Sequence, residues 1–199
     1  MNALYRFFLL QAAIFLPYHR NRRNWLLHQI GLPMSVFGFM VALAWVEFFD
    51  VGGYTVSLAT VVVIPAMVFW LFFDFAIGLV TTLFYAVLLV LADLAAGLPF
   101  AGSAAIVAGF FVGGMVFQYI GHELEDGKLA AAGLLSAPTS FLMLVRTTFG
   151  TPNTTILHNH IQLFVVPMVL IATIAFRLGY KLDLKAEMER HPKVGNLER

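Results

Sequence analysis

The chain has 199 residues, of which 60% are hydrophobic and only 12% are charged. Soluble domains usually carry about twice that charged fraction, so the composition excludes an ordinary soluble domain and indicates an integral membrane protein. The net charge of +1 is too balanced to indicate a nucleic-acid partner. The chain has no cysteine, which excludes disulfides, thiolate zinc sites, iron–sulfur ligation and cysteine nucleophiles.

The first element is an apolar N-terminal segment that ends at Pro17. It resembles the core of a signal peptide, but Arg6 interrupts it and no small-x-small cleavage site precedes Pro17. We therefore expect this segment to be mature chain and to form an interfacial helix.

Six hydrophobic runs follow, separated by turn signals such as "DVGGYT" and "AAGLPFAGS": 34–49, 54–73, 76–96, 103–121, 134–149 and 161–179. Several of them reach the roughly 20 residues that a spanning helix needs, whereas the first and fifth are short. This pattern predicts an all-α, polytopic membrane helix bundle with five to six hydrophobic helices. We expect one transmembrane domain over 1–180 and a charged C-terminal tail over 181–199.

Small and charged residues inside the runs have plain structural interpretations. Gly109 and Gly113 have GxxxG spacing, which predicts close helix packing at these two positions. Asp74 and Asp93 lie in or next to hydrophobic runs, where a carboxylate is costly unless it is paired, so we expect each to pair or to cap a helix.

A polar cluster, "PYHRNRRNWLLHQIGLP" at 17–33, precedes the first run. Its three arginines place it on the cytoplasmic side by the positive-inside rule. Four runs separate His28 from His122, so both histidines should emerge on the same membrane face. His158 and His160 join them if 134–149 is re-entrant, which its shortness favours, and lie on the opposite face if it spans.

Five of the six histidines lie at the ends of hydrophobic segments. Each could be a plain interfacial residue, but their recurrence favours a metal site, and imidazoles without thiolates suit iron, zinc, copper or nickel. Helical spacing places Asn24 with His28, and His122 with Glu125, on shared faces. Glu125 is a ligand, a residue that orients a ligand, or a solvated carboxylate. In "LHNH" at most one histidine is an easy ligand if the helix has already begun.

Two blocks, "YHRNRRNWLLHQIGLP" and "GGMVFQYIGHELEDGKLAA", resemble the membrane 2-hydroxy fatty acid dioxygenase family, whose fungal member is named for metabolism of phytosphingosine to odd-numbered fatty acids. "FDFAIGL" between the blocks resembles a further family segment. The residues that match are Tyr18, His19, Asn24, His28, Gly31, Pro33, Gln118, Gly121, His122 and Glu125. Asp126 and Leu129 depart from the family pattern.

The resemblance implies an Fe(II)-dependent enzyme that uses O₂ to shorten 2-hydroxy fatty acids by one carbon in α-oxidation, with the iron on His19, His28 and His122. We add His160 as a fourth ligand, with His158 as its substitute. The residues expected to contact substrate or to orient ligands are Asn24, Glu125, Arg20, Arg23 and Gln118. The site would lie at the cytoplasmic face of the bacterial cytoplasmic membrane or of the endoplasmic reticulum, depending on the host. The oligomeric state stays open.

Three alternatives compete with this interpretation. Di-iron lipid hydroxylases carry HxxxH and HxxHH clusters, and the sequence contains neither. A non-enzymatic membrane protein would bind haem, lipid or a metal ion through its interfacial histidines. A membrane scaffold would bind no metal.

Overall fold

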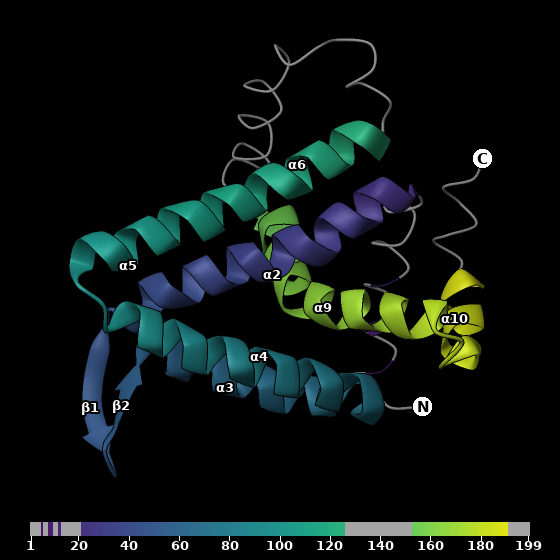
Figure 1. Ribbon diagram of the computed structural model, residues 1–199. Coiled ribbons are helices and arrows are strands. Elements are labelled where there is room, and N and C mark those ends of the chain that lie inside the picture. Colours follow the sequence, from purple (N-terminus) through teal and green to yellow (C-terminus); the bar gives the residue numbers. More distant parts are fainter. Residues whose placement is uncertain (1–4, 6–7, 10–11, 13–20, 126–152, 191–199) are drawn as a thin grey trace. The chain divides into compact units, whose positions relative to one another are not determined.

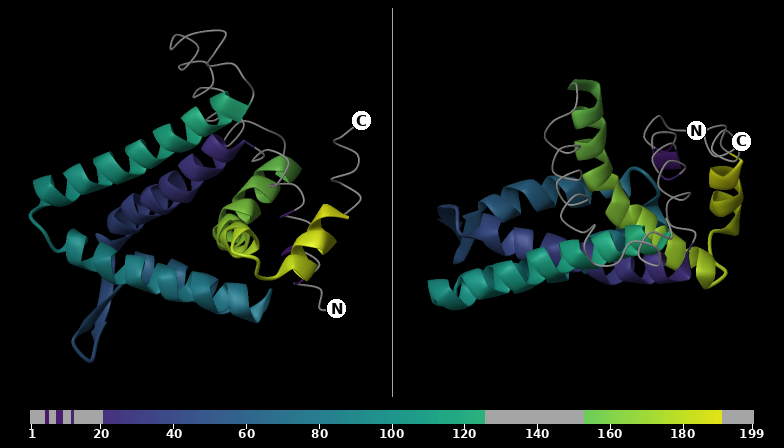
Figure 2. Two further views of the ribbon diagram at one scale, coloured as in Figure 1. Left: turned by 45° about the vertical axis from the view of Figure 1, so that its right-hand side comes forward. Right: turned by 90° about the horizontal axis from the view of Figure 1, so that it is seen from above.

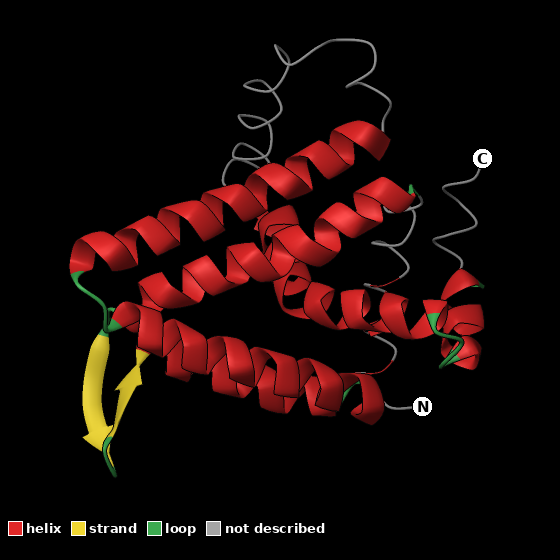
Figure 3. Cartoon of the chain, in the orientation of Figure 1, coloured by secondary structure: helices red, strands yellow, loops and turns green. Residues whose placement is uncertain are grey.

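The computed structural model describes residues 5, 8–9, 12, 21–125 and 153–190, and for Glu125 and 153–164 it describes the backbone alone. Figures 1 and 3 show helices throughout, with one two-stranded hairpin. The elements are α2 (Arg22–Ala44), β1 (Glu47–Val51), β2 (Tyr54–Ser57), α3 (Leu58–Leu71), α4 (Phe75–Ala96), α5 (Phe100–Val107), the π-helical segment η2 (Ala108–Val112), α6 (Gly113–Glu125), α9 (Asn153–Arg177) and α10 (Leu182–Glu189).

The predicted all-α membrane fold is confirmed. Among the described residues, three helical stretches are long and apolar enough to cross a membrane: Arg22–Ala44, Phe75–Ala96 and Phe100–Leu124. The pair Val165–Arg177 and Leu182–Glu189 also qualifies as one broken span, bent by 117°. Helix α3 is apolar but has only 14 residues. The expected interfacial helix and the run at 134–149 lie almost wholly outside the described residues.

The boundaries predicted for the first two runs are wrong, because a β-hairpin interrupts them. Helix α2 ends at Ala44 and α3 begins at Leu58, so the ends of both runs form β1 and β2. The turn between the strands is Gly52–Gly53, with φ values of +59° and +84°. Two central residues with positive φ are what a tight hairpin turn requires. A short apolar run does not distinguish strand from helix by periodicity, and the aromatic and β-branched residues here favour strand.

The chain forms two compact units, which are described separately. One comprises Met1–Tyr5 and Gln29–Phe117, and the other comprises Arg6–His28 and Gln118–Arg199. The prediction of a single domain over 1–180 stays a prediction. In the predicted tail, α10 is helical and buries Leu184 and Met188.

In the first unit, α3 and α4 run side by side, as Figure 2 shows. Asp74 is the N-cap of α4, and its side chain accepts a hydrogen bond from the Ile77 amide at 3.0 Å, so the prediction of a capping role is confirmed. Gly78 lies against the backbone of Trp70, and the Trp70 and Tyr85 rings meet edge to face at 5.0 Å. Asp93 is paired, as predicted, because its carboxylate accepts a 2.7 Å hydrogen bond from the Tyr54 hydroxyl.

The prediction that Gly109 and Gly113 mediate close packing is wrong. Among the described residues, a Cβ at Gly109 would meet nothing within 4 Å, and one at Gly113 would meet only the end of the Met34 side chain. Two other glycines make the close approach between these helices: Gly114 lies against Gly31 and Ser35 of α2, and Gly38 of α2 lies against the backbone of Phe111. Gly109 lies in η2, and a π-turn adds a residue to the helical repeat, so the packed face shifts away from the GxxxG pair.

In the second unit, the start of α2 packs on the C-terminal half of α9. The Trp25 indole N–H donates to the Thr173 hydroxyl at 2.8 Å, and the Arg177 guanidinium carbon lies 3.7 Å from the centroid of the Trp25 ring. Thr173 in turn donates to the Leu170 carbonyl oxygen. Met168 and Ala172, also in α9, are fully buried. The first turns of α2, which carry the polar cluster, are therefore held by a specific aromatic and polar contact.

Candidate functional site

Two of the predicted ligands, His28 and His122, lie next to each other in the second unit. Their ring centroids are 4.7 Å apart, and the ring planes cross at 78°. His28 lies two turns into α2 and is 3% exposed, whereas His122 lies in the last turn of α6 and is exposed. One imidazole is thus enclosed by protein, and its neighbour is open to a ligand that approaches from outside.

The hydrogen bond of the His28 ring determines which nitrogen carries the proton. Nδ1 lies 3.1 Å from the carbonyl oxygen of Asn24, one helical turn earlier. A carbonyl oxygen only accepts, so Nδ1–H is the donor and, in the neutral ring, Nε2 keeps its lone pair. Metal-binding histidines usually have their second nitrogen fixed in this way. His28 is therefore held in the tautomer that suits a ligand.

Gly121 allows α2 and α6 to approach each other at the histidine pair. A Cβ at this position would collide with Oδ1 of Asn24 and would come within 3.0 Å of His28 Nδ1. Asn24 itself is fully buried against α6. Any side chain at 121 would push the two helices apart, so the absence of one sets the position of the imidazoles.

Asn21 ties the two helix ends together, and our sequence interpretation did not single it out. Its Oδ1 accepts a 2.9 Å hydrogen bond from the Arg23 amide, which caps the first turn of α2. Its Nδ2 donates at 3.2 Å to the carbonyl oxygen of Leu124, in the last turn of α6, where carbonyls lack intrahelical partners. Asparagine immediately before a helix is a known capping signal, but the second bond joins residues too distant in sequence to be predicted.

Glu123 is a second residue that the sequence interpretation missed. It is 6% exposed, which is unusual for a carboxyl group. The sequence favours Glu125 because it shares a helical face with His122, but the side chain of Glu125 lies outside the described part of the structure. The stretch "HELED" offers several acidic residues, and nothing in the sequence indicates which one is buried.

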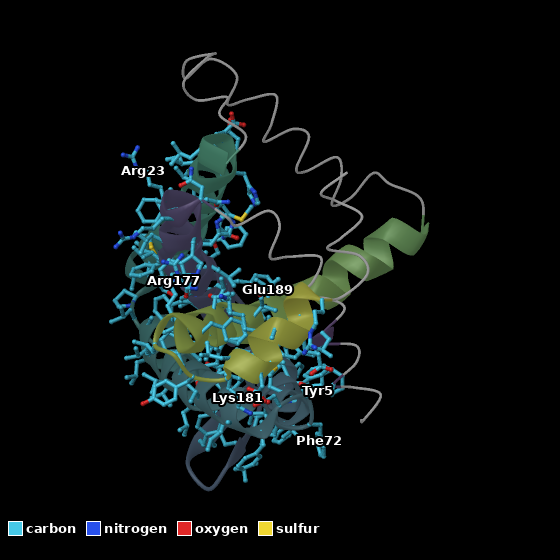
Figure 4. The ribbon with its side chains drawn as sticks, turned by 90° about the vertical axis from the view of Figure 1, so that its right-hand side faces the viewer. Tyr5, Arg23, Phe72, Arg177, Lys181 and Glu189 are labelled. Atoms are coloured by element: carbon cyan, nitrogen blue, oxygen red, sulfur yellow. The ribbon has the colours of Figure 1, made fainter. Side chains whose placement is uncertain are left out.

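The remaining predicted residues differ in how much of each one the structure describes. Gln118 is half-buried one turn before His122, and Arg23 is exposed and stands out from α2 in Figure 4. His19 and Arg20 lie outside the described residues. His158 and His160 lie within α9, which begins at Asn153, so the helix has already begun at both and at most one is an easy ligand. Their side chains are not described. Over 21–124 and 165–190, the side chains form no group of three or more histidines and carboxylates that could hold a metal.

The pair still fits two positions of a metal shell. When two imidazoles bind one ion with an N–metal–N angle of about 90° and metal–nitrogen bonds of about 2.1 Å, their ring centres lie about 4.5 Å apart. The observed separation of 4.7 Å agrees with this arrangement. Edge-to-face packing of two rings produces a similar separation, which makes metal analysis the deciding measurement.

Comparison with known proteins identifies the family. The model of the Mpo1-like family, described as 2-hydroxy-palmitic acid dioxygenase Mpo1-like, matches residues 5–151. No curated protein and no solved structure matches the chain. The match covers well over half of the chain and includes both blocks of the resemblance and both histidines of the pair. The chain therefore belongs to the Mpo1-like family.

Proposed function

We propose that this protein is an Fe(II)-dependent membrane dioxygenase that shortens 2-hydroxy fatty acids by one carbon. The observation that carries the proposal is the His28–His122 pair, because two imidazoles from separate helices adjoin each other in a chain whose family is described as a 2-hydroxy-palmitic acid dioxygenase. Membership of the family supports the substrate class. The donor set supports iron over magnesium or calcium, which prefer oxygen ligands.

In this proposal His28 and His122 hold the iron, and His19 and His160 complete its protein ligands, with His158 as the substitute for His160. The Asn24 carbonyl would keep the proton on Nδ1 of His28, so that Nε2 would be the nitrogen that binds the metal. Gly121 keeps the two helices close enough for both rings to contribute. When bound, Fe(II) supplies the activation of O₂ and a binding point for the 2-hydroxy carboxylate.

The substrate would lie partly in the membrane. The helices that carry the pair are long and apolar enough to span a bilayer, so an acyl chain can lie beside them in lipid. Arg20 and Arg23 are our candidates for holding the carboxylate, because Arg23 is exposed at the same end of α2 as His28. We therefore propose that the reaction occurs at the cytoplasmic face, the side that the arginines favour for the start of α2.

The test is conversion of 2-hydroxypalmitate by protein purified in detergent without oxygen and then assayed with Fe(II) and O₂. We expect O₂ uptake matched by a product one carbon shorter. His28→Ala and His122→Ala should each lose at least about 100-fold in rate, since changes in residues that merely orient metal ligands already cost about 10–100-fold. His191→Ala, a histidine of the C-terminal tail, is the matched control and should retain the wild-type rate.

Full activity of His122→Ala would overturn the proposal. A Soret band in the purified protein, abolished in His28→Ala, would replace it with a haem-binding function. Conversion that is independent of added iron and resistant to chelators would retain the substrate and reject the cofactor.

A further inference from the structure

The β1–β2 hairpin presents an apolar surface that contributes nothing to the site described above. All five residues of β1 are exposed, among them Phe49 at 61% and Val51 at 59%. Soluble proteins rarely leave aromatic and branched side chains so open on consecutive strand positions. The hairpin lies wholly within the first unit, whereas the histidine pair belongs to the second.

The pairing register sorts the hairpin into two faces. Phe49 pairs with Val56 and Val51 pairs with Tyr54, and side chains directly opposite each other lie on the same side of a sheet. Asp50 and Thr55 form the pair between them, so their side chains lie on the other face, where they are joined by a 2.6 Å hydrogen bond. One face is therefore apolar and aromatic, and the other carries a polar pair.

The backbone excludes the hydrocarbon core as the place of this hairpin. In the described part of the chain, the sheet has only these two strands, so the outer edge of each strand presents unpaired N–H and C=O groups. Such groups are costly in lipid tails, where water is absent. The apolar face needs an apolar neighbour, whereas the edges need water or polar headgroups. The membrane–water interface supplies both.

Aromatic and polar contacts fix the base of the hairpin at the ends of three candidate spans. Trp45 follows the last residue of α2, and its indole N–H donates to the Ser103 hydroxyl of α5 at 2.8 Å. The Trp45 and Phe100 rings lie 5.4 Å apart. The Tyr54 hydroxyl donates to Asp93 near the end of α4. Tryptophan and tyrosine are enriched at the membrane–water interface, where rings with one polar edge fit best.

The Tyr54 contact also persists at neutral pH. Partial burial raises the pKa of Tyr54, and the Asp93 carboxylate raises it further, against the opposing effect of the hydrogen bond with Thr60. The hydroxyl therefore stays protonated and remains a donor, and the hairpin keeps its attachment to α4.

The charges select the kind of lipid surface. The hairpin carries Glu47 and Asp50, and the sequence contains no lysine or arginine between Arg23 and Lys128. Anionic headgroups would be repelled by these carboxylates, whereas zwitterionic headgroups would not.

We propose that the face formed by Phe49, Val51, Tyr54 and Val56 is a membrane-interface anchor that lies among zwitterionic headgroups. The anchor fixes the depth of α2 and α3 in the bilayer by joining their ends to the headgroup layer. It does not depend on iron or on the proposed reaction.

The chain has no cysteine, so a single introduced cysteine can be labelled without background. We would place a fluorophore at Phe49→Cys and, as the matched control on the polar face, at Thr55→Cys, each in phosphatidylcholine vesicles. Nitroxide-labelled headgroups should quench the label at 49 several-fold more than the label at 55, and aqueous iodide should show the reverse order. Val51→Cys and Asp50→Cys form a second pair of the same design, in case the first pair alters the hairpin.

Equal iodide quenching at positions 49 and 55, with no quenching by headgroup nitroxides, would overturn the proposal. Disulfide cross-linking between two copies of the Phe49→Cys variant, in a preparation with the same oligomeric state as the wild type, would also overturn it, because a second copy would then cover the face. If headgroup nitroxides quench the label at position 49 equally well in metal-free protein, the anchor does not depend on the proposed iron site.

Discussion

The two ends of α2 are built in opposite ways. At its first turns, polar residues are buried: Asn24 is fully enclosed and His28 is 3% exposed. Beyond its last turn, apolar residues are exposed on a hairpin that includes Phe49 and Val51. In a chain with so many apolar residues, an exposed leucine or valine on a spanning helix carries no information, because lipid surrounds it. Two exceptions to this pattern are informative. The buried polar side chains at the start of α2 support the proposed metal site, and the exposed apolar strand supports the proposed interface anchor.

Glycine has a different structural role at each of the two ends. At the histidine end, a missing side chain at Gly121 allows two helices to meet, and Asn21 joins their ends. At the hairpin end, Gly52 and Gly53 supply the positive φ values of a tight turn, and no described residue lies within 4 Å of a Cβ at either position. Glycine therefore serves close packing in one region and backbone conformation in the other.

The largest expected effect comes from filling the space at Gly121. Gly121→Ala should lower the free energy of unfolding by about 2 kcal/mol, because the new methyl group meets Asn24 and His28 in a packed contact. Gly109→Ala is the control, since its methyl group meets nothing and should be neutral or stabilise by up to about 1 kcal/mol. Unfolding midpoints in detergent would measure both. Equal effects of the two substitutions would contradict a close contact between Gly121 and α2.

Asn21→Ala should have the next largest effect, about 1.5 kcal/mol, because it removes a helix cap and the hydrogen bond to Leu124. Asn21→Ser keeps a capping hydroxyl but is too short to reach Leu124, so it should cost about half as much. Iron affinity measured on the same variants should fall in the same order. A serine variant as weakened as the alanine variant would assign the whole effect to the bond with Leu124.

The contact between Trp25 and Thr173 should contribute about 1 kcal/mol. Trp25→Phe and Thr173→Val each remove the hydrogen bond, so the double variant should be less destabilised than the sum of the two single variants. A double-mutant cycle on unfolding in detergent measures this coupling. Additive effects would mean that α2 and α9 are not held together by this bond.

The smallest effect should come from the hairpin end. Tyr54→Phe removes the hydrogen bonds to Asp93 and Thr60 and should cost about 0.5 kcal/mol, because the side chain is partly solvated. Thr55→Val, which removes the exposed bond to Asp50, should cost still less. Amide hydrogen exchange across 47–57 would report both. Faster exchange in Thr55→Val than in Tyr54→Phe would contradict the attachment of the hairpin through Tyr54.

Much of the fold was predictable because hydrophobicity and length dominate in a membrane chain. The runs at 76–96 and 103–121 located the candidate spans Phe75–Ala96 and Phe100–Leu124, whereas the first run missed the start of α2, which lies in the polar cluster. The cost of an unpaired carboxylate in lipid predicted the roles of Asp74 and Asp93. The hairpin was not predicted, because the aromatic and branched residues at 47–57 suit a helix in lipid as well as a strand. The GxxxG prediction was wrong because the π-turn at Ala108–Val112 changes which glycines face α2.

The proximity of His28 and His122 was predictable from the sequence, whereas their role as metal ligands stays a prediction. Counting the runs placed His28 and His122 at one face, and the structure brings their rings together. The proton on Nδ1 of His28 and the bond from Asn21 to Leu124 depend on distances that only a folded backbone defines. The roles of His19 and His160 stay predictions, since their side chains lie outside the described residues.

The most direct test of the account is elemental analysis of anaerobically purified protein: wild type, His28→Ala, His122→Ala and His191→Ala. The account predicts stoichiometric iron in the wild type and in His191→Ala, and its loss in both of the other variants, because one shared site needs both imidazoles. Iron retained in both His28→Ala and His122→Ala, or no iron in the wild type, would contradict it.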